Sequence, residues 1–292
     1  MPLQLVNFKP KEGYTFTYDI VAKILKVKKG RLNITLDLWL SEVTVEVDNN
    51  SVILPNGQKI KKVMLKETVK KEDYVYFLKK KGENIFPLIA SSDEGKFYKL
   101  KYLGKDKAPT LEISGIHMHN IVGTEPMRDA RRKAALARIK KGDKVLDICT
   151  GLGYTATASL ERGAKIVLSI EKDPLVLELA SYNPWSRRLA DPKVKVVLGD
   201  AYLVVEELER EFFDKVIHDP PCFALAGELY SLSFYRKIFR VMRRGGVMVH
   251  YTGAPGRSRG VDVQRGVIQR LRAAGFIVVR AIKGYCVVAV KP

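Results

Sequence analysis

The chain has 292 residues, 46% of them hydrophobic, and a formal net charge of +19. This hydrophobic share is enough for a core and excludes a disordered chain, while the basic excess favours an anionic partner. No apolar stretch approaches the ~18 residues of a membrane span, and Cys149, Cys222 and Cys286 lack CxxC spacing. We therefore expect a cytoplasmic protein with neither a membrane nor a metal partner.

The type of basic residue changes along the chain. Residues 1–110 hold 21 basic and 13 acidic side chains, and Arg31 is their only arginine. Residues 111–292 hold 30 basic and 19 acidic side chains, with 18 arginines. Lysine acts as a point charge, whereas arginine makes forked contacts to phosphate. A lysine-rich solvated surface is the alternative explanation. The polar stretch at 105–109, with Gly104 and Pro109, predicts a boundary between a basic β-rich module at 1–108 and a second domain at 109–292.

In the first part, short alternating runs predict strands over 32–36 and 43–47, and Asn56-Gly57 is a strong hairpin signal. A shared aromatic face predicts a short helix over 72–80. Two further strands are expected over 97–103 and 111–116.

In the second part, a helix over 127–139 precedes a regular alternation of strands and helices. The expected strands cover 144–148, 165–170, 194–198, 213–218 and 246–251, and the expected helices cover 154–162, 174–182, 202–210, 230–242 and 260–273. Segments 276–282 and 285–290 are separated only by Lys283-Gly284, which predicts a hairpin. The fold class is therefore α/β: a seven-stranded, mostly parallel Rossmann-like sheet with a terminal antiparallel hairpin, plus a smaller β-rich N-terminal domain.

The first strand of this alternation runs into a glycine turn, Asp147-Ile148-Cys149-Thr150-Gly151-Leu152-Gly153. In open α/β sheets, ligands bind outside the carboxyl ends of the strands, where Glu171 and Asp200 also fall. Gly151 and Gly153 followed by Ala156 also fit a dinucleotide fingerprint. However, the carboxylate of Asp147 would repel a pyrophosphate and suits a cofactor's ammonium group.

These motifs resemble the class I S-adenosylmethionine-dependent methyltransferases over residues 140–292. The resemblance implies that Asp147, Gly151 and Gly153 hold the methionine part of S-adenosyl-L-methionine, Glu171 the ribose, and Asp200 with Ala201 the adenine. The other cofactor-binding residues that it implies are Thr150, Tyr154, Thr155, Lys172 and Asp219. The stretch from His117 to Met127 lies where such enzymes close over the cofactor, although His117 and His119 also suit an ordinary loop or strand end.

The fourth strand ends in His218-Asp219-Pro220-Pro221-Cys222-Phe223. This looks like the (Asp/Asn)-Pro-Pro-aromatic motif of methyltransferases that modify exocyclic amines of bases. Such an amine is a poor nucleophile because its lone pair is delocalised into the ring. The carboxylate of Asp219 and the carbonyl of Pro220 can both accept its N–H groups and aim the lone pair, because proline fixes the backbone. Pro221 completes the motif, and Phe223 is expected to stack on the base.

Cys222 departs from that motif and leaves an alternative open. Pro-Pro-Cys resembles the nucleophile motif of cytosine-C5 methyltransferases, which attack the ring with a thiolate. After the fifth strand the chain reads His250-Tyr251-Thr252-Gly253, without the second cysteine of the RNA enzymes. We therefore expect Cys222 to be a small buried residue.

A second alternative comes from Glu228-Leu229-Tyr230-Ser231, which is similar to the corresponding helix of aminopropyltransferases such as spermidine synthases. Those enzymes need an acidic pocket for a cationic amine, whereas this helix is basic. Together with Asn183-Pro184-Trp185-Ser186 and Gly253-x-Pro255-Gly256, this stretch resembles an archaeal family of predicted methyltransferases with an N-terminal β-rich domain. That resemblance implies cytidine N4 in ribosomal RNA as the target. Arg257, Arg259 and Tyr235 are the candidate substrate contacts. A non-catalytic RNA-binding protein is the remaining alternative.

Overall fold

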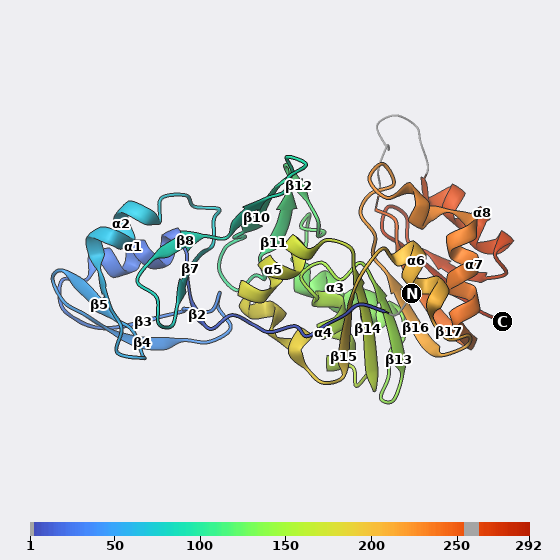
Figure 1. Cartoon of the computed structure of the whole chain (residues 1–292), viewed down its shortest axis with the longest axis horizontal. Coiled ribbons are helices and arrows are strands. Elements are labelled where there is room, and N and C mark those ends of the chain that lie inside the picture. Colours follow the sequence, from blue (N-terminus) through green and yellow to red (C-terminus); the bar gives the residue numbers. More distant parts are fainter. Residues whose placement is uncertain (1–2, 254–262) are drawn as a thin grey trace. The chain divides into compact units, whose positions relative to one another are not determined.

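The structure is a computed structural model that describes residues 3–253 and 263–292, and the chain divides into two compact units (Figure 1). The first unit contains Met1–Phe8, Met127–Pro174 and Arg188–Pro292, and the second contains Lys9–Pro126 and Leu175–Arg187. Both ends of the chain therefore belong to the first unit. These units do not coincide with the division into 1–108 and 109–292, which as a domain boundary stays a prediction.

The first unit is built on an eight-stranded sheet with the order β1-β15-β14-β13-β16-β17-β19-β18. Five neighbouring strands are parallel: β15 (Val194–Leu198), β14 (Ile166–Glu171), β13 (Lys144–Ile148), β16 (Phe213–His218) and β17 (Met242–Tyr251). The terminal hairpin places β19 (Cys286–Val290) antiparallel to both β17 and β18 (Ile277–Ala281). This confirms the mostly parallel sheet and its final hairpin.

The expected count of seven strands is wrong by one. The extra strand is β1 (Leu5–Val6), which pairs antiparallel with β15 through Leu5 and Val197. Two residues carry no detectable periodic pattern, so the sequence gives no sign of this strand. Its formation depends on the free edge that β15 offers, because backbone N–H and C=O groups at a sheet edge need partners.

Helices cover this sheet because their apolar residues recur on one face. In α7 (Leu232–Val241), Phe234, Ile238 and Val241 are fully buried, four and three residues apart. Among the described residues, the other helices of the first unit are α3 (Pro126–Leu136), α4 (Tyr154–Glu161), α6 (Ala201–Glu207), η2 (Gly227–Tyr230) and α8 (Val263–Ala273). Helix α5 (Pro174–Tyr182), from Leu175 onward, and the first part of η1 (Pro184–Ala190) belong to the second unit. Helix α7 packs against both α6 and α8 (Figure 1). None of the helices within residues 3–253 and 263–292 is long and apolar enough to cross a membrane.

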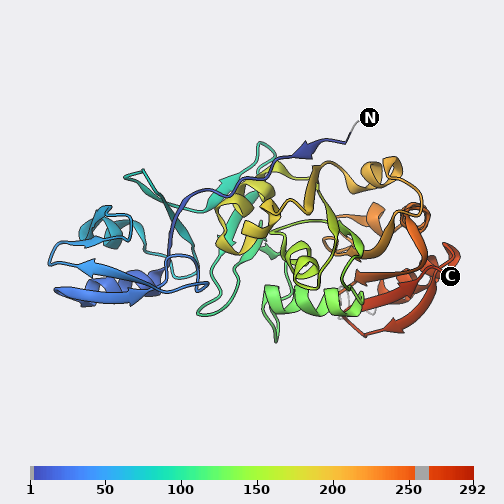
Figure 2. The ribbon, with the colours of Figure 1, turned by 90° about the horizontal axis from the view of Figure 1, so that it is seen from below.

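The second unit holds three small antiparallel sheets. Their strands are β2 (Gly13–Phe16), β7 (Tyr76–Lys79) and β8 (Ile85–Pro87); β3 (Gly30–Ile34), β4 (Val43–Val47), β5 (Ser51–Ile53) and β6 (Lys59–Lys61); and β9 (Ile89–Ser91), β10 (Phe97–Lys101), β11 (Thr110–Ile113) and β12 (Ile116–His117). Figure 2 shows the strands of this unit, in blue to green, from below. The expected strand over 43–47 is confirmed at its bounds.

In this unit one expected helix is a strand, and two helices occur that were not expected. Residues 76–79 form β7 rather than part of a helix over 72–80, and Tyr76, Phe77 and Leu78 are all buried. A strand covered on both faces gives an uninterrupted apolar run, which imitates a helix face in sequence. Helices α1 (Tyr18–Lys26) and α2 (Lys62–Thr68) were not expected. They are short, and tertiary packing stabilises short helices more than their own propensity does.

Candidate active site

Four predicted site segments meet at one edge of the sheet in the first unit. The turn after β13, the end of β14, the start of α6 after β15 and the loop after β16 follow neighbouring parallel strands. Ile148 pairs with Ile170 on one side and with His218 on the other. Because carboxyl ends of parallel strands meet at the same edge, Glu171, Asp200 and Asp219 come to one place although up to 48 positions separate them in the sequence.

The turn after β13 has three residues in the left-handed backbone region. Cys149, Gly151 and Gly153 have φ values of 71°, 53° and 75°. The amide N–H groups of Cys149 and Thr150 both donate to the carbonyl of Ile170, at 3.0 and 2.9 Å. Left-handed backbone at a non-glycine residue such as Cys149 is uncommon and marks a constrained turn. No pattern in the sequence indicates this conformation for Cys149.

The acids at the ends of β14 and β15 are held by backbone amides. The carboxylate of Glu171 accepts from the N–H of Gly151 at 2.8 Å and from those of Lys172 and Asp173 at 2.9 and 3.0 Å. Asp200 caps α6 by accepting from the N–H of Tyr202 at 2.8 Å, and its other oxygen lies 2.8 Å from the ammonium of Lys172. Although burial opposes it, this lysine lowers the pKa of Asp200. Both carboxylates are thus fixed in position.

Asp147 is fully buried beside the turn. Its Oδ2 accepts from the hydroxyl of Ser169 at 2.6 Å, whereas its Oδ1 has no hydrogen-bond partner among the described residues. Burial raises the pKa of this carboxyl to about 7. A buried carboxylate oxygen without a partner is costly in a protein without ligand, and it fits the ammonium group of a bound cofactor.

This burial predicts a pH-dependent effect of Asp147→Asn. The folded protein holds a proton on Asp147 up to about pH 7, whereas an unfolded chain releases it near pH 4. Because the folded state then binds more protons than the unfolded state, the wild type should lose stability as the pH rises between these values, by on the order of 2–4 kcal/mol, and Asp147→Asn should lack this contribution. Denaturant unfolding of both proteins at pH 4.5 and 7.5 measures this. A difference in unfolding free energy that stays constant with pH contradicts the prediction.

Asp219 lies 19% exposed at the end of β16 and is paired with a lysine that the sequence analysis did not select. Its Oδ2 is 2.6 Å from Nζ of Lys133, which is also 2.8 Å from Oδ2 of Asp129. The same ammonium lies 4.1 Å from the centre of the Tyr251 ring. The four-residue spacing of Asp129 and Lys133 on α3 indicates from the sequence that these two side chains can form an ion pair. Nothing in the sequence, however, brings them to Asp219, 86 positions away.

The loop after Asp219 carries the rest of the motif. The hydroxyl of Tyr230 donates to the carbonyl of Pro221 at 2.9 Å, which anchors the loop to η2. Phe223 is 45% exposed, and its ring meets that of Tyr230 at 5.4 Å and 76°. The expectation that Cys222 is a small buried residue is wrong, because Cys222 is exposed. It sits in a loop that turns outward after the two prolines.

The position of Tyr235 does not agree with the expectation that it contacts the substrate. Tyr235 is fully buried, and its hydroxyl lies 3.0 Å from Nε2 of His250. His250 in turn packs on His218 at 4.3 Å between ring centres. Burial lowers the pKa of His218 to about 4, so it is neutral at physiological pH. Tyr235 thus belongs to a polar core beneath the loop and does not face a substrate. Arg257 and Arg259 lie outside the described residues.

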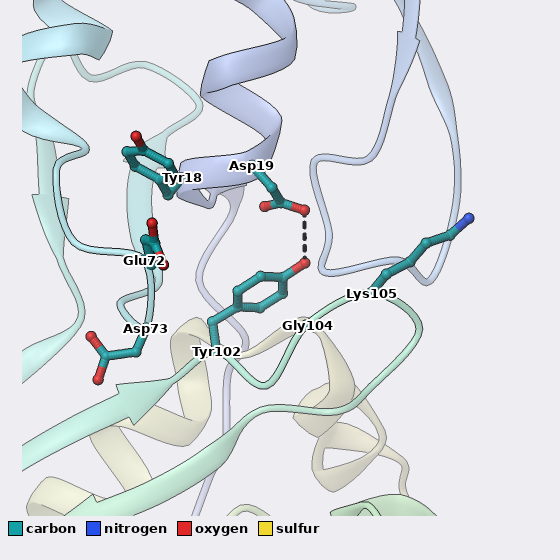
Figure 3. A pocket seen from close by; sticks show the side chains of 7 residues that line it. All are labelled: Tyr18, Asp19, Glu72, Asp73, Tyr102, Gly104 and Lys105. Atoms are coloured by element: carbon teal, nitrogen blue, oxygen red, sulfur yellow. Dashed lines mark hydrogen bonds between the residues drawn. The ribbon is translucent and has the colours of Figure 1, made fainter.

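The two histidines expected near the cofactor both belong to the second unit and have local partners there. Nε2 of His117 lies 3.1 Å from Glu112, and Nδ1 of His119 lies 3.0 Å from the hydroxyl of Thr110. Their role in closing over the cofactor stays a prediction. This unit also has an open pocket of about 380 Å³. Figure 3 shows its lining residues, among which Tyr102 donates to Asp19 and none of the predicted site residues occurs.

Together, the strand order, the antiparallel β19 and the glycine turn define a Rossmann-like methyltransferase fold. The chain belongs to the family of the uncharacterized protein MJ1233 of Methanocaldococcus jannaschii. The two are 43% identical over 282 residues, which cover 94% of this chain and 95% of that protein. Residues 112–242 also match the family described as Conserved hypothetical protein 95.

Two further similarities are more restricted. The M. jannaschii protein named "Putative ribosomal RNA large subunit methyltransferase MJ1653" is 38% identical over 88 residues, 30% of this chain and 23% of that protein. The crystal structure of spermidine synthase from Thermotoga maritima matches with a TM-score of 0.56 and 20% identity, over 70% of this chain and 71% of that one. At that identity the likeness concerns the fold alone.

Proposed function

We propose that the protein is an S-adenosyl-L-methionine-dependent methyltransferase that acts on an exocyclic amine of a base in RNA. The observation that carries this proposal is the position of Asp219-Pro220 at the carboxyl end of β16, directly beside the glycine turn that follows β13. An acceptor for an amine N–H and a turn suited to a cofactor thus occupy adjacent strand ends.

The residues of this edge fit the cofactor. The free Oδ1 of Asp147 suits its ammonium group, and Glu171 and Asp200 suit its ribose and adenine. Gly151 and Gly153 let the backbone come close to the cofactor. The other residues proposed to contact the cofactor are Thr150, Tyr154, Thr155, Lys172 and Ala201. When bound, S-adenosyl-L-methionine would supply an electrophilic methyl group and leave as S-adenosylhomocysteine, and the methylated amine would lose one proton.

The chain's own residues then orient the amine. Oδ1 of Asp219 and the carbonyl of Pro220 accept its two N–H groups, which directs the nitrogen lone pair out of the ring plane. Phe223 offers an exposed ring on which an unstacked base can rest. Because unstacking costs least in single-stranded RNA, loops are the favoured targets.

An RNA partner is supported by charge and by local similarity. The net charge of +19 suits a polyanion. The 88-residue similarity to a protein named as a putative ribosomal RNA methyltransferase also supports an RNA substrate. Our specific proposal for the target is cytidine N4 in ribosomal RNA. The lysines of the second unit would track the RNA backbone.

Two other activities have an observation in their favour. Exposure of Cys222 leaves a thiol available for attack on a cytosine ring, as the C5 reaction requires. The fold shared with a spermidine synthase is compatible with aminopropyl transfer to a polyamine. Aminopropyl transfer to a polyamine does not explain the basic composition of the chain, and the C5 reaction lacks the second cysteine of the RNA enzymes after the fifth strand.

The proposal predicts the product of the reaction. Purified protein incubated with S-adenosyl-L-methionine and unmodified ribosomal RNA should give N4-methylcytidine, or another base methylated on an amine, in nucleoside mass spectrometry. The activity should fall steeply with salt, because RNA binding releases counterions. Formation of 5-methylcytidine would favour the thiolate reaction, and transfer only to polyamines would reject RNA as the substrate.

A further inference from the structure

We propose that Lys133 is a specificity-determining residue that reserves Asp219 for a neutral aromatic amine and excludes alkylammonium substrates such as diamines. This inference rests on the proposed function and names the chemical class of amine that the site accepts. It concerns a lysine that no motif of the sequence points to.

Lys133 is held tightly in place. Its side chain is 4% exposed, and its ammonium has a carboxylate on two sides, Asp129 at 2.8 Å and Asp219 at 2.6 Å, and the Tyr251 ring at 4.1 Å on another. Although burial alone disfavours the charge, the two carboxylates raise the pKa of Lys133. The lysine therefore stays protonated, and with its partners on three sides it cannot swing away without leaving a buried charge unpaired.

This arrangement limits what Asp219 can bind. Oδ2 is occupied by Lys133, so Oδ1 and the carbonyl of Pro220 remain as the acceptors of the motif. A neutral –NH₂ group on an aromatic ring has two N–H bonds, which match two acceptors and leave the lone pair free. An alkylammonium group has three N–H bonds and no lone pair, and it must lose a proton before it can react.

Charge acts in the same direction. Two donors bound to the two oxygens of one carboxylate lie roughly 5 Å apart, so an ammonium at Oδ1 would meet the positive charge of Lys133 in a partly buried site. A neutral amine meets no such repulsion. Enzymes that act on cationic amines need a carboxylate that is not already paired with a positive charge. Here the carboxylate of Asp219 is already paired with Lys133. Specificity of this kind depends on a repulsive element as well as on attraction.

The test compares binding of putrescine, a diamine, to the wild type and to Lys133→Met, both saturated with S-adenosylhomocysteine, by calorimetry. We expect no measurable binding to the wild type. The variant should bind at an affinity at least ~10-fold tighter than the detection limit of the wild-type experiment, because the site gains a net negative charge. Lys133→Gln is a second uncharged variant in case Lys133→Met does not fold. Lys133→Arg keeps the charge and should keep the exclusion, and Lys140→Met removes one charge from an exposed position and should change nothing.

A second measurement separates this role from a structural one. Burial raises the pKa of Asp219, and Lys133 opposes that rise. In Lys133→Met, the acidic limb of the kcat/KM profile for RNA should therefore move to higher pH, and alkaline conditions should restore part of the activity. Among the described residues, the titratable groups around Asp219 that remain are Asp129 on α3, Asp147 on β13, Cys149 in the turn after β13, Tyr230 on η2, Tyr251 on β17 and Cys286 on β19.

The outcomes distinguish the two proposals. A wild type that methylates RNA and also binds putrescine at Asp219 overturns the role of Lys133 but keeps the function. Variants at Lys133 that bind putrescine no better than the wild type overturn it as well. A wild type that leaves RNA unmethylated, and transfers to diamines instead, rejects the function and the specificity together.

Discussion

Asp219→Ala is expected to lower kcat by about 100- to 1000-fold, whereas Cys222→Ala should retain most of the activity. The carboxylate of Asp219 is the acceptor that orients the amine and directs its lone pair, so its loss removes an interaction made in the transition state. Cys222 lies exposed beyond the two prolines and is a bystander in this mechanism. Single-turnover methylation of RNA by each variant, at saturating cofactor, measures the effect.

A conservative change refines this experiment. Asp219→Asn keeps an acceptor oxygen in place but loses the charge that Lys133 pairs with at 2.6 Å. We expect it to fall between the wild type and Asp219→Ala. An inactive Cys222→Ala, together with a covalent adduct on RNA that contains 5-fluorocytidine, would instead establish the thiolate mechanism. Circular dichroism of each variant controls for misfolding, since Asp219→Ala leaves Lys133 with one carboxylate fewer.

Gly153→Ala is expected to destabilise the protein and to abolish cofactor binding. Gly153 has a φ of 75°, where any side chain is strained, and a Cβ there would lie 2.5 Å from Cγ of Leu189. Left-handed backbone costs about 1–2 kcal/mol, and overpacking adds about 1–3 kcal/mol. Chemical denaturation measures the first effect, and calorimetry with S-adenosyl-L-methionine measures the second.

Gly142 offers a matched control for this prediction. It has a φ of 93° in the same unit, but a Cβ there meets nothing within 4 Å. Gly142→Ala should therefore show the backbone strain without the collision and leave cofactor binding intact. Equal losses of stability for the two variants, with full cofactor affinity in both, would contradict the close approach at Gly153.

Most strands of the parallel sheet were predictable from the sequence, because each of them has a recognisable local pattern. Strands 144–148, 194–198 and 213–218 and helix 174–182 have the predicted bounds. Buried parallel strands are continuous Val/Ile/Leu runs, and the helices between them have their own period. The second unit gave weaker signals, since its strands and helices are short and depend on packing. Strand β7 resembled a helix in sequence because it is short and buried on both faces, so its apolar run shows no alternation.

The candidate site also has a part that local sequence patterns predict and a part that depends on tertiary contacts. Asp147, Glu171, Asp200 and Asp219 were predictable together, because the ends of successive parallel strands must meet at one edge. The sequence by itself therefore determined the parallel strands of the sheet with the final hairpin, the glycine turn and the acids around it, but not the edge strand β1. Only the tertiary structure decided the surroundings of those acids: the lysine on Asp219, the burial of Tyr235 and the exposure of Cys222. Contacts of this kind join distant segments through side-chain packing, which no spacing within one segment encodes.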